Sequence, residues 1–350
     1  MLKRTMQEIA LYRKYRPKKW SDVLGQDNIV KVIESSVKLK RISHAYLFTG
    51  DRGTGKTSVA RILASDIGCK EEDLYEIDAA SNRGIDDIRE IKQSVSALPF
   101  RSPYKVYIVD EVHMLTKDAC NALLKTLEEP PAYIVFILAT TEPEKLPETV
   151  ISRCQVFNFK RPSQNILKEM VLNIARKENF TLEPASAELV ALLSEGSFRD
   201  AQGILQKVIN SSKDKKISLE EVELVTGAPK NELVNDFVKA LAGKDVKGGL
   251  QAISVAAQQN LDMKVFLKLI LQKVRFVLLI RLKAGLDKEI ESEVRKEDFE
   301  FLKELSGQKG FNINSNTLYE LLDTHDKIGR SYIPQLPLEL VLVKLSQQEK

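Results

Sequence analysis

The 350-residue chain has few cysteines, and the three that it has follow no metal-binding or redox spacing. Cys69, Cys120 and Cys154 form no CxxC pair and are odd in number, which argues against a disulfide framework. Free thiols are the default in a reducing compartment. We therefore expect a cytoplasmic protein.

Long apolar runs are also missing. The longest purely apolar stretch is "IVFILA" at 134–139, far short of the roughly 20 residues that span a bilayer. The N-terminal segment "MLKRTMQEIALYRKY" is basic but has no apolar core of the kind a secretory signal requires. The sequence thus predicts no secretory signal and no membrane partner.

A general excess of positive charge is absent too, although the formal net charge is +4 at pH 7. The first 20 residues hold seven Lys or Arg and one Glu, so the remaining 330 residues sum to −2. Such a protein would meet nucleic acid through local positive patches, or through several copies acting together.

What the first 160 residues do have is an alternation of short β-branched runs with helical patterns. This order is typical of a parallel sheet with crossover helices, so the predicted fold class is α/β. Helices are expected from Lys56 to Ile67, at about 86–98, and after Thr116 as far as the prolines of "EEPP". The predicted strands are 45–50, 74–79, 105–110, 134–140 and 155–159.

After "KRPS" at 160–163 the strand patterns disappear and helical patterns remain. Ser163 is a plausible N-cap, and "SLEE" at 218–221 has the form of a capping box. The segment 265–282 is apolar on nearly all faces, so we expect it to be buried between other helices. The predicted domains, namely an α/β nucleotide-binding domain, a small helical lid and a helical collar, lie at 1–162, 163–227 and 228–350.

The strongest motif is "GDRGTGKT" at 50–57, which matches the P-loop pattern G-x-x-x-x-G-K-[ST] between a predicted strand and a predicted helix. Its glycines would let backbone N–H groups surround phosphate oxygens at a helix N-terminus. Lys56 would reach the β- and γ-phosphates, and the Thr57 hydroxyl would bind Mg²⁺. The expected nucleotide-binding loop comprises Gly50, Asp51, Arg52, Gly53, Thr54, Gly55, Lys56, Thr57 and Ser58.

Two further strand ends carry residues suited to the same site. "VYIVDEVHML" at 106–115 ends an apolar strand in Asp110, which would hold Mg²⁺, and Glu111, which would polarise an attacking water. "LATTEP" at 138–143 offers Thr140 or Thr141 as a sensor of the γ-phosphate, although threonine is also common in ordinary strands.

Two arginines are ambiguous from the residues alone. Arg199, in "GSFRDA", is followed by an aspartate and reads more simply as a solvated salt bridge. Arg153, in "ETVISRCQVFNF", has no acidic residue within three positions and reads as a surface arginine at the start of a strand.

Taken together, the segments resemble the bacterial DNA polymerase III gamma/tau subunits, which are AAA+ ATPases of the replicative clamp loader. The resemblance is dense over about residues 11–205 and only architectural beyond them. The segments that carry it are "LYRKYRPKKWSDVLGQ", "HAYLFTGDRGTGKTS", "EIDAASNRGIDDIR", "VYIVDEVHMLTKDACNALLKTLEEPP", "LATTEPEKLPETVISRC" and "GSFRDA".

The resemblance implies roles that the residues alone leave open. It makes the α/β domain an AAA+ module, Thr140 the first sensor, and Arg199 a second sensor that reports nucleotide to the lid. "SRC" at 152–154 matches a trans-acting arginine motif, so Arg153 would enter the ATP site of a neighbouring subunit. The residues expected around adenine are Arg16, Pro17, Val23 and Leu24.

The chain departs from the family pattern in two places. Members usually carry a four-cysteine zinc module after the first helix, whereas "IGCKEEDLYEIDAAS" retains only Cys69. A closed structural zinc site needs four ligands, so no zinc is predicted. The chain also ends at Lys350 without the extension of tau-type members, which fits either a gamma-length product or a shortened form of a longer chain.

The function that the resemblance implies is ATP-driven loading of a sliding clamp onto primer–template DNA, as a bacterial component of the DNA polymerase III holoenzyme. The cofactors would be ATP and Mg²⁺, and the partners would be other loader subunits, copies of the chain, the clamp and DNA. DNA contact would be sequence-independent and made through phosphates. The candidate residues, for which a solvated helix face is an equal explanation, are Arg83, Arg89 and Lys92.

Two other functions remain open from the sequence. A non-hydrolysing structural subunit of the same loader would need no active ATP site, and the presence of Lys56, Thr57, Asp110 and Glu111 argues against it. A processive AAA+ DNA motor, such as a branch-migration helicase, would share the motifs but would separate strands.

Overall fold

The computed structural model describes residues 9–81, 94–282 and 285–347, and these form two compact units. The first unit comprises residues 1–174 and 194–206, and the second comprises 175–193 and 207–350. The two units are described separately below. The three domain boundaries expected from the sequence stay a prediction.

The first unit is built on a five-stranded sheet in the order β2-β3-β4-β1-β5, in which every pairing is parallel. Each strand matches its predicted range to within one residue, and the α/β fold class is confirmed. The strands are β1 (Ala45–Thr49), β2 (Leu74–Asp78), β3 (Lys105–Asp110), β4 (Ile134–Thr140) and β5 (Gln155–Asn158).

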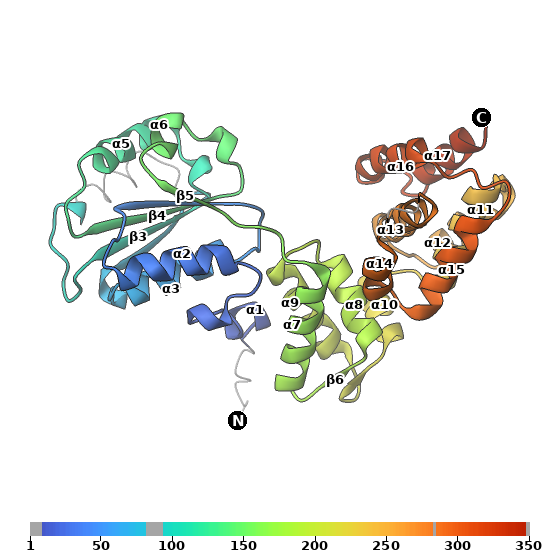
Figure 1. Cartoon of the computed structure of the whole chain (residues 1–350), viewed down its shortest axis with the longest axis horizontal. Coiled ribbons are helices and arrows are strands. Elements are labelled where there is room, and N and C mark those ends of the chain that lie inside the picture. The colour runs from blue at the N-terminus through green and yellow to red at the C-terminus, as the bar shows by residue number, and fades with distance from the viewer. Residues whose placement is uncertain (1–8, 82–93, 283–284, 348–350) are drawn as a thin grey trace, which may run out of the picture. The chain divides into compact units, whose positions relative to one another are not determined.

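Helices cover both faces of this sheet (Figure 1). Alternate residues of each buried strand point to opposite faces, so Leu47 packs with α5 and α6 while Phe48 packs with α2 and α3. The helical elements of this unit outside the lid segment are α1 (Leu11–Lys14), η1 (Trp20–Asp22), α2 (Asp27–Lys38), α3 (Lys56–Asp66), η2 (Glu71–Asp73), η3 (Val112–Met114), α5 (Lys117–Glu128), η4 (Pro143–Lys145) and α6 (Glu148–Ile151).

Two of the dividing points fall within helices, namely α7 (Gln164–Lys177) and α9 (Phe198–Ser211). Ser163 caps α7 as expected, because its Oγ accepts the Ile166 N–H at 3.3 Å. The expectation that strands end before residue 163 is wrong, because β6 (Thr181–Leu182) and β7 (Lys216–Ile217) form a short parallel pair. Each strand is two residues long, too short to show an alternating pattern in the sequence.

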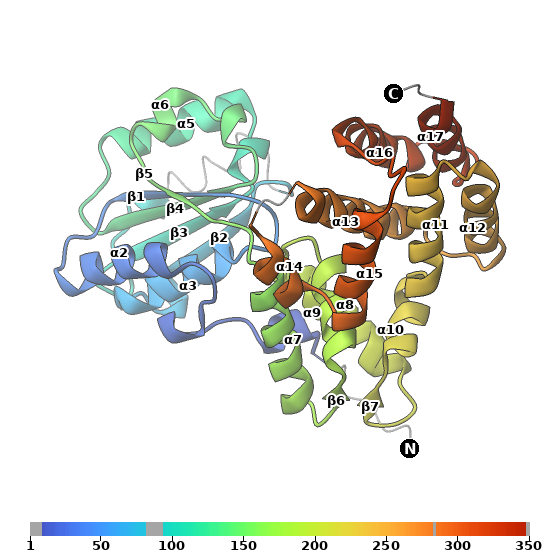
Figure 2. The ribbon, with the colours of Figure 1, turned by 45° about the vertical axis from the view of Figure 1, so that its right-hand side comes forward.

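The second unit is otherwise helical, and Figure 2 shows α11 and α12 packed side by side within it. The predicted capping box is confirmed, since Ser218 and Glu221 each accept the other's backbone N–H. The apolar segment predicted to be buried is helix α13, whose residues form much of the core of this unit. The helices are α8 (Pro184–Leu193), α10 (Leu219–Thr226), α11 (Asn231–Gly243), α12 (Val246–Gln258), α13 (Met263–Arg281), α14 (Asp287–Glu293), α15 (Lys296–Gly307), α16 (Ser315–Ile328) and α17 (Leu336–Gln347).

Candidate nucleotide-binding site

The predicted P-loop joins the carboxyl end of β1 to the first turn of α3. Gly50 and Gly53 adopt left-handed φ angles of 131° and 75°. A Cβ at Gly50 would lie 2.4 Å from the Phe159 carbonyl oxygen, and one at Gly53 would lie 2.1 Å from the Ser197 Oγ. Both positions therefore require glycine for backbone conformation and for space.

Lys56 is 6% exposed, and its ammonium donates to the carbonyl oxygens of Gly50 and Asp51 at 2.6 and 2.9 Å. Burial lowers the pKa of Lys56, while the nearby carboxylates of Glu111, Asp110 and Asp51 oppose that shift. The Lys56 ammonium thus lies within the loop between β1 and α3, held by two carbonyl oxygens of that loop.

Thr57 and Asp110 bring the P-loop and β3 together. The Thr57 hydroxyl donates to Asp110 Oδ2 at 2.8 Å. A hydroxyl oxygen and a carboxylate oxygen are hard ligands of the kind that Mg²⁺ takes in nucleotide sites. These two side chains fit the expected magnesium site, with Asp110 directly followed by Glu111 at the end of the strand.

Glu111 has an unusual backbone, with φ 50° and ψ 44°. A non-glycine residue in this region costs on the order of 1–3 kcal/mol, and such strain clusters at functional sites. Its carboxylate accepts the Thr141 hydroxyl at 3.1 Å, so the strained backbone directs the side chain toward the end of β4.

Thr140 is fully buried at the end of β4 and contacts a residue that the sequence reasoning did not single out. Its Oγ1 lies 2.9 Å from Nδ1 of His113, which follows β3 in η3. The opposite ring nitrogen, Nε2, lies 3.1 Å from Glu142 Oε1. The only signal for His113 in the sequence was its place two residues after Glu111.

The start of α9 is attached to the P-loop. The Phe198 N–H donates to the Gly53 carbonyl oxygen at 2.9 Å. The guanidinium of Arg199 stacks on the ring of Tyr12, with 5.6 Å between its carbon and the ring centroid. Arg199 thus follows directly after Phe198, which is bonded to the P-loop, and its guanidinium packs on Tyr12 of α1.

A second arginine next to the P-loop was also missed by sequence reasoning. Arg161 donates to both carboxylate oxygens of Asp51, at 2.6 and 3.0 Å. These bonds hold the pKa of Asp51 below its usual range. The two residues are 110 positions apart, so no local pattern indicates the pair. The other P-loop side chains are the buried Thr54, the half-buried Ser58 and the exposed Arg52.

The residues expected around adenine precede α2. Arg16, Pro17 and Val23 are half-buried, whereas Leu24 is 42% exposed. Burial lowers the pKa of Arg16, and the neighbouring cations of Arg61, Arg199 and Arg13 lower it further, against the opposing effect of Glu76. Arg16 therefore belongs to a cluster of arginines rather than to a purely apolar lining.

Arg153 has an acidic partner that its immediate sequence does not reveal. Its guanidinium donates to Glu128 Oε1 at 2.8 Å and to the Thr149 carbonyl oxygen at 2.8 Å. Glu128 is the last residue of α5. The side chains of Arg153 and Glu128 are 34% and 49% exposed.

Three expected DNA-binding residues, Arg83, Arg89 and Lys92, lie outside the described residues. Within the ranges that are described, no group of three or more His, Cys, Asp or Glu residues is arranged to hold a metal ion. A search of the helices in those same ranges finds none that is both long enough and apolar enough to cross a membrane.

The chain is similar to subunits of DNA polymerase III. A family model described as "DNA polymerase III, delta subunit" matches residues 25–83 and 72–163. The chain is 38% identical to the DNA polymerase III subunit tau of Bacillus subtilis over 97% of its own length, which is 63% of that relative. It is 37% identical to the DNA polymerase III subunit gamma of Buchnera aphidicola, over 78% of the chain and 79% of the relative.

The chain thus spans less than two thirds of several curated relatives, including 43% of the Escherichia coli tau subunit, to which it is 36% identical. Among solved structures, the RuvB Holliday junction branch migration motor of Thermotoga maritima is similar, with a TM-score of 0.53 and 23% identity. That likeness covers 65% of this chain and 79% of the RuvB chain, and it shows a shared fold alone.

Proposed function

The chain belongs to the DNA polymerase III gamma/tau family, and from this premise we propose that it is an ATP-hydrolysing subunit of a bacterial clamp loader. The observation that carries the proposal is the meeting of three parallel strand ends. Lys56 and Thr57 follow β1, Asp110 ends β3 and is followed by Glu111, and Thr140 ends β4. Ligands of open α/β sheets bind at the carboxyl ends of the strands.

In this proposal the chain's own groups bind and orient ATP. The Lys56 ammonium exchanges its two carbonyl partners for β- and γ-phosphate oxygens, and Thr57 and Asp110 hold Mg²⁺. Bound there, Mg²⁺ would supply positive charge that offsets the charge developing on the phosphates. Glu111 orients and polarises the attacking water, and Thr140 contacts the γ-phosphate.

We assign Arg153 to the ATP site of a neighbouring copy or subunit. An exposed ion pair is worth about 0–1 kcal/mol, so the bond to Glu128 would hold Arg153 only weakly. A guanidinium supplied in trans accelerates related phosphoryl transfers by about 10³–10⁵. Arg199 would report the nucleotide to the lid, since its neighbour Phe198 is bonded to the P-loop.

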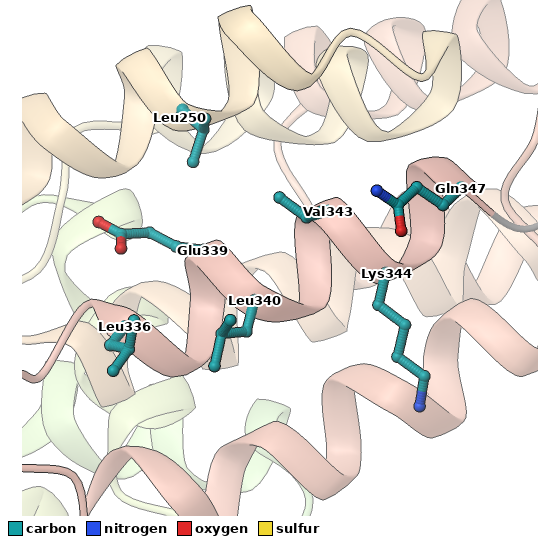
Figure 3. Close-up of a pocket in the computed structure, with 7 residues that line it drawn as sticks. All are labelled: Leu250, Leu336, Glu339, Leu340, Val343, Lys344 and Gln347. Atoms are coloured by element: carbon teal, nitrogen blue, oxygen red, sulfur yellow. The ribbon is translucent and has the colours of Figure 1, made fainter.

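Assembly would involve the helices of residues 228–350. Figure 3 shows a groove in which Leu250 of α12 faces the side chains of α17. Leu340 and Leu336 on this groove are 61% and 37% exposed. Exposed apolar surface of this kind supports contact with other loader subunits or with copies of the chain.

The proposed loading cycle combines these parts. ATP would join neighbouring modules through Arg153, the assembled loader would hold a sliding clamp open, and primer–template DNA would enter through phosphate contacts. Hydrolysis would release the closed clamp on DNA. We place this activity in the bacterial cytoplasm.

The test is complementation of ATP hydrolysis between two inactive variants of the full chain. Lys56→Ala should not bind ATP productively, whereas Arg153→Ala should bind ATP but lack the trans arginine. We expect each to be nearly inactive alone and a mixture to regain part of the wild-type rate. A chain with both substitutions, mixed with Lys56→Ala, is the control and should regain nothing.

Failure would take distinct forms. Wild-type hydrolysis by Arg153→Ala would refute the trans role. No ATP hydrolysis by the wild-type chain assembled with the other loader subunits would instead support a structural subunit. Strand separation by the purified chain would support a DNA motor.

A further inference from the structure

A buried histidine connects two groups of the proposed ATP site. The His113 side chain is 4% exposed and lies between the ends of β3 and β4. Its Nδ1 is 2.9 Å from Thr140 Oγ1 and 3.5 Å from Glu111 Oε2, and its Nε2 is 3.1 Å from Glu142 Oε1. One ring thus touches the sensor threonine and borders the carboxylate that would polarise water.

The partners of the ring determine where its protons lie. Glu142 also accepts from the Lys145 ammonium at 2.7 Å, so its carboxylate is an acceptor, and Nε2 must carry the proton that faces it. Nδ1 of the neutral ring is then an acceptor. Thr140 Oγ1 already accepts the Glu142 N–H at 3.0 Å, and when the His113 ring is the neutral Nε2–H form, the single Thr140 proton can be donated to Nδ1.

This arrangement has a consequence for nucleotide binding. A threonine hydroxyl has one proton to donate. While that proton is held by His113, Thr140 cannot donate it to a γ-phosphate. The Glu111 carboxylate is meanwhile fixed by the Thr141 hydroxyl on one side and bordered by the His113 ring on the other.

We propose that His113 is a positioning residue for Thr140: its ring accepts the Thr140 proton and keeps the hydroxyl oriented at the end of β4, beside Glu111, until a γ-phosphate takes that proton. This inference rests on the proposed ATPase function. The side-chain hydrogen bonds of Lys56 and Thr57 go to Gly50, Asp51 and Asp110 rather than to His113, so we expect His113 to act on turnover through Thr140 and not to hold the nucleotide itself.

Two conservative variants separate the ring nitrogens. An asparagine amide oxygen falls near the position of Nδ1, so His113→Asn should keep the acceptor for Thr140. A glutamine amide falls near Nε2, so His113→Gln should keep only the contact with Glu142. We expect kcat of His113→Gln to fall about tenfold, which corresponds to one hydrogen bond. His113→Asn should stay within about threefold of wild type.

The KM for ATP should not rise, and the affinity for a non-hydrolysable ATP analogue should not fall, in either variant, because the γ-phosphate competes with His113 for the Thr140 proton. His325→Asn and His325→Gln are matched controls, because this histidine lies half-exposed on α16 and outside the first unit. A purely structural role would lower the activity of both His113 variants equally and in step with thermal stability. That result, or wild-type kcat in His113→Gln, would overturn the proposal.

A cycle with Thr140→Val tests whether His113 acts through the threonine. If it does, His113→Gln should cost little further activity once the hydroxyl is gone, because coupled residues are non-additive. Additive losses would overturn the coupling.

A measurement without turnover completes the test. The chain has three histidines, so nitrogen NMR of the imidazoles can be assigned with single substitutions. We expect the neutral Nε2–H form of His113 without nucleotide, and a change at Nδ1 when the ATP analogue and Mg²⁺ are added. An Nδ1–H form or an imidazolium at the start would overturn the proposal. A wild-type chain that hydrolyses no ATP refutes the proposed function by itself, and the NMR result still decides the hydrogen bond.

Discussion

Replacing Asp298 by asparagine should destabilise the second unit strongly, because it leaves the buried ammonium of Lys273 without its counter-charge. Both side chains are 11% exposed and lie 2.8 Å apart, between α13 and α15. Lys273 also donates to the amide oxygens of Asn231 and Asn235 at 2.7 and 2.6 Å, so its three protons are all bonded. Arg295 donates to the second carboxylate oxygen of Asp298 at 3.0 Å.

Breaking a buried ion pair by removing one partner typically costs about 3–5 kcal/mol. Asp298→Asn should therefore lower the free energy of unfolding by that amount. Substituting Lys273→Met in the same chain should recover part of the loss, because no buried charge then remains.

The loss of stability in Asp298→Asn should also depend on pH. Burial lowers the pKa of Lys273, and the carboxylate of Asp298 opposes that shift in the native protein. Without the carboxylate the folded pKa falls further below the unfolded value of about 10.4. Between these two values the unfolded chain binds more protons, so stability rises with pH. The variant should thus be most destabilised at neutral pH and recover toward about pH 9–10.

Urea unfolding followed by far-UV circular dichroism measures the loss of stability at neutral pH and at about pH 9–10. Hydrogen exchange should show that the loss of protection lies in α11, α13 and α15. Asp323→Asn is the matched control, because its partner Lys327 lies one turn away and both side chains are at least half exposed. This change should cost less than about 1 kcal/mol. Equal losses in the two variants, or a loss in Asp298→Asn that does not shrink with rising pH, would refute the reasoning.

Three further outcomes are expected. Burial raises the pKa of Asp73, but N–H donors of residues 100–102 lower it overall. Asp73→Asn should therefore lower the free energy of unfolding by about 1.5–3 kcal/mol, measured by tryptophan fluorescence during denaturation. The effect should disappear as acid protonates the wild-type carboxylate. Gly53→Ala should lower the affinity for an ATP analogue more than tenfold by calorimetry, because its Cβ would lie 2.1 Å from a serine oxygen. Gly203→Ala is the control and should leave the affinity unchanged, because no atom lies within 4 Å of the added Cβ. Burial raises the pKa of Cys154 to about 12, so iodoacetamide at about pH 8 should modify it only after unfolding.

The fold could be predicted wherever local sequence determines the backbone. Buried strands appear as short β-branched runs, and all five were placed to within one residue. The Thr116 side chain caps α5 as its position indicated, accepting the Ala119 N–H. The strands β6 and β7 were missed because two residues carry no period, and their pairing joins segments far apart in the chain.

The site was predicted only where a motif specifies both residue type and spacing. The P-loop pattern locates Lys56 and Thr57, and a strand ending in two acids locates Asp110 and Glu111. The contacts of His113 depend instead on which strands are neighbours. β3 and β4 lie side by side in the sheet, so their ends bring His113 to Thr140 across 27 residues of sequence. No local pattern contains that information.

The ion pair of Arg153 is a second contact that local sequence does not reveal. The sequence flanking Arg153 offers no acid and indicated a surface arginine, the trans role being implied only by the family resemblance, whereas the end of α5 supplies Glu128 at 2.8 Å. This finding leaves the trans role as a proposal and changes its energetics. A free guanidinium would enter a neighbour's site at no electrostatic cost, whereas Arg153 must exchange one carboxylate for a phosphate. Because the pair is exposed, the exchange costs at most about 1 kcal/mol. A triphosphate with its greater charge can therefore displace Glu128, and the ion pair would hold Arg153 oriented at the surface until a loaded neighbour is present.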